Sequence, residues 1–410
     1  MILSEVFPVP VEWLDTVEET MADTVAGWAE REVSSKRLEH GEDREKLLAP
    51  ATKSLFVDIG LQSIMVPERL GGGGMDSPEA VMTACASLEA VGTVDTGIGF
   101  AAANTLAFIS SFGLEPGRDD ALLDKLAPVF TGGEPAVATL VLPAYADSGA
   151  EGNARFNGLD YQVVAAPDDN RFALSGRDVR PQCCGTSAAL FAFAFDSGKG
   201  PAFGIVSRQA QGLTIGDEFL KTGLAASDNA ELVLDSVRVP SEDVVCTGPE
   251  EFLSVLDRYY LFCAAVTSGA LLATYGILKE WGDTRVIKGK GQVFKENPLV
   301  ASMMGEVGAN TARTRMLTYQ LARMLSKPDV YGPPGAPALN ATATAVFKGA
   351  TGAAMRAMDA TMELMGSAGY ATEWNLERYW RDIKTLEATV VPETAALVDM
   401  ARHYFGLKTL

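Results

Sequence analysis

One carboxylate stands at the entrance to a stretch of sequence without charge. Asp257 lies in the run Leu256-Asp257-Arg258, and residues 259–278, which follow it, contain no Asp, Glu, Lys or Arg. Low-dielectric surroundings raise the pKa of an acidic side chain and bring it toward the strength of a general base. Asp257 is therefore a candidate for abstracting a proton. An acid near the start of a helix, stabilised by the helix dipole and paired with Arg258, remains an open alternative.

The histidine and cysteine residues do not form a recognisable metal site or nucleophilic catalytic site. The two His, His40 and His403, lie near opposite ends of the chain, and the only close pair among the five Cys is Cys183-Cys184. Neither set has the spacing of a zinc or iron–sulfur site, and neither His lies in a recognisable nucleophile context. We therefore expect no metal, and we expect a bound organic cofactor or a carboxylate to carry the chemistry of any reaction.

The charge balance restricts the partners and the location. The 34 Lys and Arg face 53 Asp and Glu, a formal net charge of −19, so the chain has no general affinity for nucleic-acid phosphates. The N-terminus lacks the basic segment of a signal peptide, and an odd, sparse set of cysteines suits a reducing cytoplasm. Residues 259–278 are about long enough to span a membrane, but their small and hydroxylated side chains favour a buried helix. We expect a cytoplasmic protein without nucleic-acid or membrane partners.

The spacing of apolar residues divides the chain into three parts that must position these groups. Residues 1–133 show helical spacing, residues 134–246 alternate with a period of two, and residues 247–410 return to helical spacing. Closely spaced short strands indicate an antiparallel sheet or small barrel rather than βαβ units. The sequence predicts an α+β protein with an N-terminal helical domain, a middle antiparallel β domain and a C-terminal four-helix bundle. Helices are predicted at 13–33, 47–59, 77–91, 297–325 and 341–366, and strands at 136–142, 161–166, 171–174, 189–195, 202–206 and 231–239.

Three motifs give the chain a family resemblance. Residues 366–384 read GSAGYATEWNLERYWRDIK, which resembles the glycine-rich turn and the following Arg-Asp-x-Lys signature of the acyl-CoA dehydrogenase family. Val66-Pro67-Glu68 looks like the N-terminal motif of that family. Arg285, with the stretch Phe294–Val300, is similar to the helix start that meets the FAD of the partner subunit. The resemblance spans the whole chain and implies the same three-part fold.

The resemblance also implies a reaction, a cofactor and partners. The reaction is the α,β-dehydrogenation of an acyl-CoA thioester, in which a carboxylate takes the α-proton and the β-hydrogen passes as hydride to FAD. The implied assembly is a homotetramer built as a dimer of dimers, and electron-transferring flavoprotein is the implied electron acceptor. The residues that the resemblance places against FAD are Arg285, Phe294, Gly366, Gly369, Cys183 and Pro143.

The position of the catalytic base departs from the common pattern of the family. In most relatives it is a Glu nine residues after the Arg of the Arg-Asp-x-Lys signature, and counting from Arg381 gives Val390 here. A branch resembling isovaleryl-CoA dehydrogenase carries its base in an upstream Leu-Glu-Arg run, which Leu256-Asp257-Arg258 matches. The resemblance therefore points to Asp257 as the base. Glu387 and Glu393 remain rivals for that role.

The remaining predicted contacts concern the substrate. The backbone N–H of Val390 is expected to donate to the thioester oxygen. Arg258 is expected to contact the substrate and to orient the Asp257 carboxylate. Because Asp is one methylene shorter than Glu, the acyl group is predicted to be shifted or bulky. By the resemblance, some relatives that act on alicyclic acyl-CoAs also use Asp, so an alicyclic group is one expectation and a carboxylated group is another. An alternative follows from the lost Glu, namely a catalytically degenerate subunit that supports an active partner in a heteromeric complex.

Overall fold

The computed structural model describes residues 6–145 and 154–407, and a helical part comes first. Asp15 begins the first long helix, because its carboxylate accepts hydrogen bonds from the N–H groups of Val17 and Glu18. α6 and α7 are absent from the sequence prediction, and α6 is buried along its whole length, so it has no polar face that would reveal a helical period. The helices of this part are α2 (Thr16–Trp28), α3 (Ser35–His40), α4 (Ala49–Lys53), α5 (Ala80–Gly92), α6 (Thr96–Gly113) and α7 (Asp120–Phe130), with π-helical turns at Ala29–Ser34, Arg44–Leu48 and Ser54–Asp58.

Two four-stranded sheets follow, and they pack against each other. Their strand orders are β1-β6-β7-β10 and β4-β5-β9-β8. Phe172 of β5 and Phe195 of β6 meet between the sheets, with ring centroids 5.0 Å apart. A short hairpin of β2 (Arg155–Phe156) and β3 (Leu159–Asp160) forms a separate two-stranded sheet. The sheet strands are β1 (Ala138–Val141), β4 (Val164–Pro167), β5 (Arg171–Val179), β6 (Leu190–Asp196), β7 (Pro201–Ser207), β8 (Leu213–Glu218), β9 (Ala230–Pro240) and β10 (Val244–Val245).

The prediction of an antiparallel β domain is wrong for one strand pair of the described chain. β1 and β6 pair in parallel, whereas the other strand pairs are antiparallel. Between β1 and β6 the chain crosses to the second sheet as β4 and β5, and this long connection lets β6 enter the first sheet in the direction of β1. β8 is also absent from the prediction, since most of its residues are exposed.

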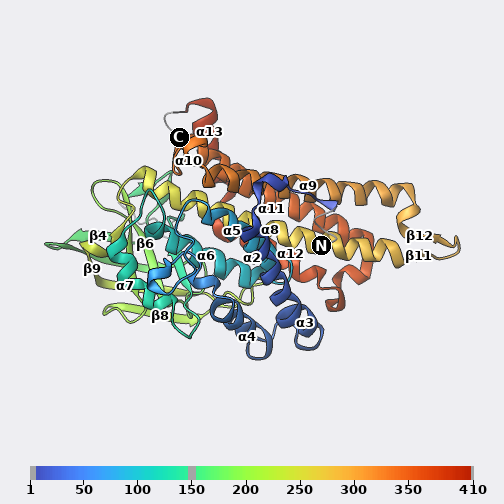
Figure 1. Ribbon diagram of the computed structural model, residues 1–410, viewed down its shortest axis with the longest axis horizontal. Coiled ribbons are helices and arrows are strands. Elements are labelled where there is room, and N and C mark those ends of the chain that lie inside the picture. The colour runs from blue at the N-terminus through green and yellow to red at the C-terminus, as the bar shows by residue number, and fades with distance from the viewer. Residues whose placement is uncertain (1–5, 146–153, 408–410) are drawn as a thin grey trace.

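The C-terminal part is a bundle of long helices around α8 (Pro249–Thr284). This helix contacts α5 and α6 of the N-terminal part as well as α9 and α11 of its own bundle (Figure 1). Among the described residues it is the one helix long and apolar enough to cross a membrane, and 78% of its most apolar window is buried inside the protein. The other elements are the hairpin β11 (Val286–Ile287) and β12 (Gln292–Val293), then α9 (Pro298–Ser326), α10 (Pro328–Tyr331), α11 (Pro337–Met365), α12 (Leu376–Val390) and α13 (Glu393–Phe405).

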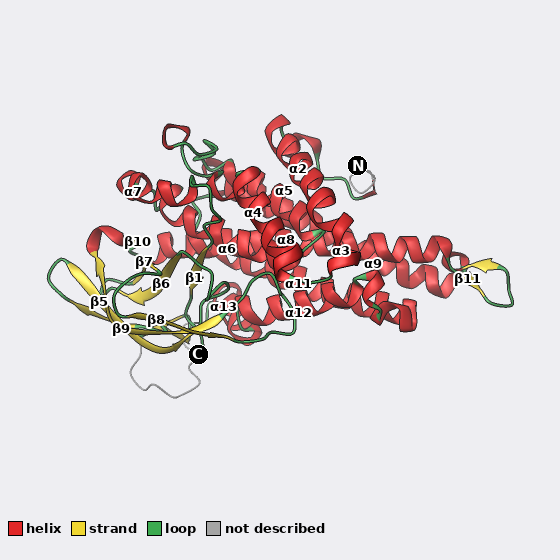
Figure 2. Cartoon of the chain, turned by 90° about the horizontal axis from the view of Figure 1, so that it is seen from below, coloured by secondary structure: helices red, strands yellow, loops and turns green. Residues whose placement is uncertain are grey.

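The elements follow the predicted order of helices, strands and helices. The larger sheets gather at one end of the molecule, and the β11–β12 hairpin projects from the other end (Figures 1 and 2). α7 ends at Phe130 and β1 begins at Ala138, while β10 ends at Val245 and α8 begins at Pro249. The predicted domain boundaries, 133/134 and 246/247, fall in these two connections.

Small residues in the uncharged stretch let α8 approach α5 closely. A Cβ atom at Gly269 would lie 2.1 Å from the carbonyl oxygen of Glu89, too close for any side chain. The neighbouring Ser268 donates a 2.6 Å hydrogen bond to the Glu89 carboxylate, which also pairs with Arg315 of α9 at 3.0 Å. One buried acid therefore joins three helices where the uncharged stretch packs.

Candidate active site

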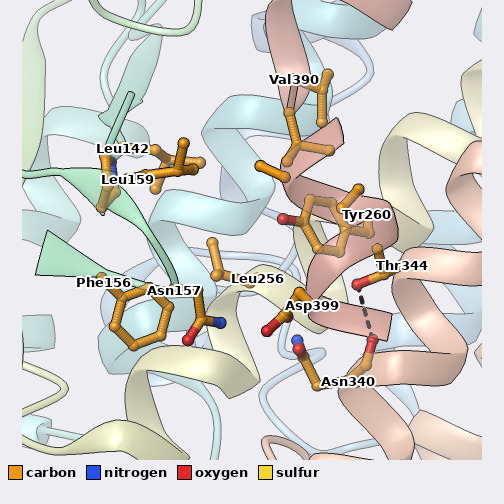
Figure 3. Close-up of a pocket in the computed structure, with 14 residues that line it drawn as sticks. Leu142, Phe156, Asn157, Leu159, Leu256, Tyr260, Asn340, Thr344, Val390 and Asp399 are labelled. Atoms are coloured by element: carbon orange, nitrogen blue, oxygen red, sulfur yellow. Dashed lines mark hydrogen bonds between the residues drawn. The ribbon is translucent and has the colours of Figure 1, made fainter. Parts of the chain in front are cut away.

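A cleft that is open to solvent lies between the β domain and the C-terminal bundle (Figure 3). Its wall is mostly apolar: Leu142, Phe156 and Leu159 come from the β domain, Leu256 comes from α8 and Val390 from α12. An apolar wall with a few polar groups is typical of a small-molecule site. The polar residues of the lining are Asn157, Tyr260, Asn340, Thr344 and Asp399.

Asp257 lies behind the wall of this cleft. Leu256 and Tyr260 of α8 line the cleft, whereas the Asp257 side chain is fully buried and is not part of the lining. Its Oδ2 accepts a hydrogen bond from the N–H of Gly335, and its Oδ1 accepts one from Nδ2 of Asn340, both at 2.7 Å. Because Asn340 lines the cleft, its amide separates the Asp257 carboxylate from the cleft.

The surroundings of Asp257 favour the protonated form. Burial raises the pKa of Asp257 to about 7, because the ionised carboxylate loses its hydration. The hydrogen bonds from Asn340 and Gly335 and the charge of Arg258 lower the pKa by less. The raised pKa agrees with the expectation from the uncharged stretch and suits a proton acceptor near neutral pH. The role of Asp257 as the base stays a prediction.

Arg258 joins two helices and is not part of the cleft lining. Its buried guanidinium donates hydrogen bonds to the carbonyl oxygens of Ser110, at 3.0 Å, and Glu115. Burial lowers the pKa of Arg258 to about 10, which still leaves the side chain protonated at neutral pH. These bonds hold α8 against the end of α6, and a contact between Arg258 and substrate stays a prediction.

Val390 lies in the cleft lining, at the position that holds the base in most relatives by the resemblance above. It is the last residue of α12, and Val391, which follows it, lines the cleft too. The two rival acids lie elsewhere. Glu387 pairs with Lys384 at 2.9 Å, and Glu393 is exposed at the start of α13. Neither acid is part of the cleft lining.

Asp399 on α13 is the one carboxylate in the lining of the described cleft, and the sequence analysis does not select it. Its side chain is 27% exposed and lies 3.9 Å from Arg402, one turn later on α13. Burial raises the pKa of Asp399, while the nearby Arg402 and Asn157 side chains lower it by less. The helical period holds a signal for it, because Ala396 and Ala395, three and four residues earlier, line the same cleft.

Four predicted cofactor contacts lie together at the hairpin end of the bundle. The Arg285 guanidinium lies over the ring of Trp281 at 5.3 Å and makes no hydrogen bond or ion pair with the described residues. The N–H of Phe294 donates to the carbonyl oxygen of Arg285 at 2.7 Å. Gly366 ends α11 with φ of +60°, and a Cβ there would meet nothing within 4 Å, whereas Gly369 packs against the α11 backbone. Along α8, roughly 43 Å separate Leu256 in the cleft from Arg285 at 1.5 Å per residue.

The two predicted cofactor contacts in the β domain lie near the cleft. Pro143 is part of the lining. Cys183 is buried, and its N–H donates to Oγ1 of Thr139 at 3.3 Å. The residue before it, Gln182, accepts a 3.0 Å hydrogen bond from Tyr259 of α8. This pair joins the β domain to the helix that carries Asp257.

Asp382 of the Arg-Asp-x-Lys signature and Arg378, one helical turn before it, belong to a buried ion network away from the cleft lining. Arg378 lies 3.4 Å from Asp382 and 3.8 Å from Asp95, which caps α6. Asp95 also pairs with Arg37 at 2.5 Å, and Asp382 accepts a hydrogen bond from the N–H of Leu224. The motif therefore joins α12 to the N-terminal helices and to the β domain. No group of three or more His, Cys, Asp or Glu suited to a metal ion occurs in the described part of the chain.

Comparison with known families decides the identity of this architecture. The family model described as "Acyl-CoA dehydrogenase, N-terminal domain" matches residues 16–127, and the one described as "Acyl-CoA dehydrogenase, C-terminal domain" matches residues 263–389. The chain belongs to the acyl-CoA dehydrogenase family. Acyl-CoA dehydrogenases are oxidoreductases that depend on FAD, and the family and the fold class predicted from the sequence are confirmed.

Individual acyl-CoA dehydrogenases match nearly the whole chain at low identity. A cyclohex-1-ene-1-carbonyl-CoA dehydrogenase of Syntrophus aciditrophicus is 23% identical, over 90% of this chain and 84% of the relative. The structure of butyryl-CoA dehydrogenase from Megasphaera elsdenii has a TM-score of 0.77 and 20% identity, covering 96% of this chain and 99% of that chain. A chain in a structure titled for the electron transferring flavoprotein of Acidaminococcus fermentans also has a TM-score of 0.77 and 20% identity, covering 97% and 99%.

The hairpin end of this acyl-CoA dehydrogenase fits part of FAD. A guanidinium without a partner among the described residues suits a phosphate group, and Arg285 provides one. Nε1 of Trp281 is buried beside it without a hydrogen-bond acceptor. Gly366 leaves open space where a side chain would stand. Arg285, Trp281 and Gly366 are therefore the residues that would hold the cofactor at this end.

Proposed function

We propose that this chain catalyses the α,β-dehydrogenation of an acyl-CoA thioester with a bulky, alicyclic acyl group. The observation that carries the proposal is the apolar cleft between the β domain and the bundle, with a carboxylate of raised pKa behind its wall. FAD, when bound, accepts the β-hydrogen as hydride. The name of the relative from Syntrophus aciditrophicus supports an alicyclic acyl group. Among the described residues the lining contains no Lys or Arg to pair with an acyl carboxylate, so the carboxylated option has less support.

Asp257 is the proposed base for the α-proton. Its pKa of about 7 allows it to be ionised at neutral pH and to bind a proton once the substrate offers one. Since the Asn340 amide occupies Oδ1, that side chain must rotate before Asp257 can reach a substrate atom. Val390, in the wall, remains the proposed backbone contact to the thioester oxygen, and electron-transferring flavoprotein the proposed acceptor.

Anaerobic bleaching of the bound flavin tests this function. Purified protein is mixed with cyclohexanecarbonyl-CoA, butyryl-CoA and glutaryl-CoA, and the fastest bleaching is expected with the alicyclic thioester. Asp257→Asn should slow bleaching by about 100-fold or more, the typical worth of a general base. Glu393→Gln, at an exposed acid of α13, serves as the matched control and should bleach at the wild-type rate. Absence of bleaching with every thioester would overturn the proposed reaction, and a fast Asp257→Asn variant would overturn the base.

A second candidate is a degenerate subunit of a heteromeric complex. Two observations favour it: Val390 stands at the common base position, and Asp257 is not part of the cleft lining. In that case the chain would be purified without flavin and would bind FAD and turn over acyl-CoA only after addition of a second acyl-CoA dehydrogenase-like chain. Flavin retained by the chain alone, with bleaching by a thioester, would exclude this candidate. For either candidate the proposed location is the cytoplasm, and for the first the proposed assembly is a dimer of dimers.

A further inference from the structure

We propose that Asp399 selects the acyl group in this cleft, favouring an alicyclic acyl-CoA that carries a ring hydroxyl and disfavouring one that carries a carboxylate. The inference deepens the proposed function and rests on it, because it assigns the cleft to the acyl group. It concerns a residue that takes no part in the proposed proton abstraction.

The first support is the distribution of polarity in the cleft. Asp399, Asn157 and Asn340 point toward one another at one end, and the remaining wall is mostly leucine, valine, alanine and aromatic carbon (Figure 3). Asn340 is already bound to Asp257 through its Nδ2. A hydrocarbon ring would fill the apolar part of the cleft and would bring a ring substituent to this polar end.

The second support is the unused hydrogen-bonding capacity of Asp399. An ionised carboxylate has about four lone-pair sites and no donor. The Asn157 side chain lies beside it, and Arg402 forms an ion pair with it at 3.9 Å, beyond hydrogen-bond distance. With its side chain 27% exposed, Asp399 still reaches the open side of the cleft. A hydroxyl on the acyl ring can donate a hydrogen bond to one of the free lone pairs of the Asp399 carboxylate.

The third support is the sign of charge in the cleft. Asp399 brings a negative charge that Arg402, 3.9 Å away, offsets in part, and the described lining contains no Lys or Arg that could pair with a second one. A carboxylate on the acyl group would meet like charge in surroundings less polar than water and would lose hydration without gaining a partner. The cleft therefore discriminates against dicarboxylic acyl groups and in favour of neutral hydrogen-bond donors.

The test compares three thioesters that differ at one ring position. Cyclohexanecarbonyl-CoA, its 4-hydroxy derivative and its 4-carboxy derivative are titrated into wild-type flavoprotein, Asp399→Asn and Asp399→Leu, with Kd from calorimetry and bleaching rates from stopped flow. In the wild type, the hydroxyl should tighten binding relative to the parent by roughly 10-fold or more, as for a hydrogen bond to a charged group, and the carboxylate should weaken it. Asp399→Leu should lose both effects. Asp399→Asn, which keeps an acceptor without the charge, should retain part of the hydroxyl preference and lose the penalty on the carboxylate.

The readouts separate this inference from the proposed function. If the wild type is bleached by the parent thioester but the ratios of the three Kd values are the same in all variants, the selectivity is overturned and the dehydrogenase function stands. If no CoA thioester binds or bleaches, both are overturned. If Asp399→Asn abolishes bleaching by all three at unchanged affinity, Asp399 takes the proton itself and the selectivity role is overturned. Glu393→Gln, on the same helix, should reproduce the wild-type ratios.

Discussion

At the scale of single residues, burial decides what each acid in and around the cleft can do. Asp257 has no exposed surface and two fixed donors, whereas Asp399 is partly exposed and has unused acceptor sites. The uncharged stretch after Asp257 was enough to predict its raised pKa. Its partners were not predictable, because Gly335 and Asn340 come from a segment far along the chain whose approach depends on the packing of α11. Asp399 needed the fold as well: the helical period puts it on one face with Ala395 and Ala396, but the local sequence does not show that this face meets the β domain.

Asp257 should leave a measurable trace in the pH dependence of stability. Folding raises its pKa from 3.8 to about 7, so the folded state binds the proton more tightly than the unfolded state. The stability that this provides is complete below about pH 4 and is lost as the pH rises through about 7. Between pH 5.5 and pH 8 we expect the wild type to lose about 2 kcal/mol through this group. Asp257→Asn should therefore show a smaller fall in Tm over that interval.

Calorimetry at the two pH values checks this expectation, with Glu393→Gln as the control for removal of an exposed acid. Asparagine can accept from the Gly335 N–H and donate to Asn340 once the latter amide turns over, so the variant should fold. An equal fall in Tm in the wild type and Asp257→Asn would contradict the raised pKa of this carboxyl.

At the scale of secondary-structure elements, the sequence predicted an element best where a capping residue or a proline marked its first turn. The helix predicted at 297–325 is α9, Pro298–Ser326, because Asn297 caps it and Pro298 fits its first turn. α6 was missed because every residue is buried, so no polar face remains to show a period. The parallel pairing of β1 with β6 was missed because strand direction depends on the connection through the second sheet, which alternation of residues does not encode.

The close packing of α5 on α8 predicts contrasting effects for two glycines of one helix. Gly269→Ala would place a Cβ 2.1 Å from the Glu89 carbonyl oxygen, so the helices must move apart, and we expect a loss of at least about 2 kcal/mol. Gly276→Ala meets nothing within 4 Å and should leave stability unchanged or raise it by up to about 1 kcal/mol through helix propensity. Urea unfolding of both variants provides the comparison. Equal stability of the two would show that the contact at Gly269 relaxes without cost.

At the scale of the whole molecule, the two groups of predicted cofactor contacts lie too far apart to serve one flavin within one chain. Pro143 is in the cleft and Cys183 is buried near it, whereas Arg285, Phe294 and the glycine turn lie at the hairpin end (Figure 1). The distance along α8, roughly 43 Å, exceeds the reach of a single FAD molecule. The family resemblance implies both groups of contacts and places Arg285 and Phe294 against the FAD of a partner subunit, and this division between subunits stays a prediction. Their separation in space follows from α8, which is one continuous helix between the cleft and the hairpin end.

Arg285 should therefore support flavin binding only in an oligomer. Its guanidinium has no partner among the described residues, and loss of a charge-assisted hydrogen bond to a phosphate should weaken FAD binding by roughly 10-fold or more. We expect Arg285→Ala to retain less flavin per chain after gel filtration than the wild type, and Lys288→Ala, another exposed cation of the same hairpin region, to retain the wild-type amount. The absorbance ratio at 450 and 280 nm, measured together with the molar mass by light scattering, checks both variants. A wild-type monomer that keeps its full flavin, or an Arg285→Ala variant that does so, would contradict the division of the cofactor site between copies of the chain.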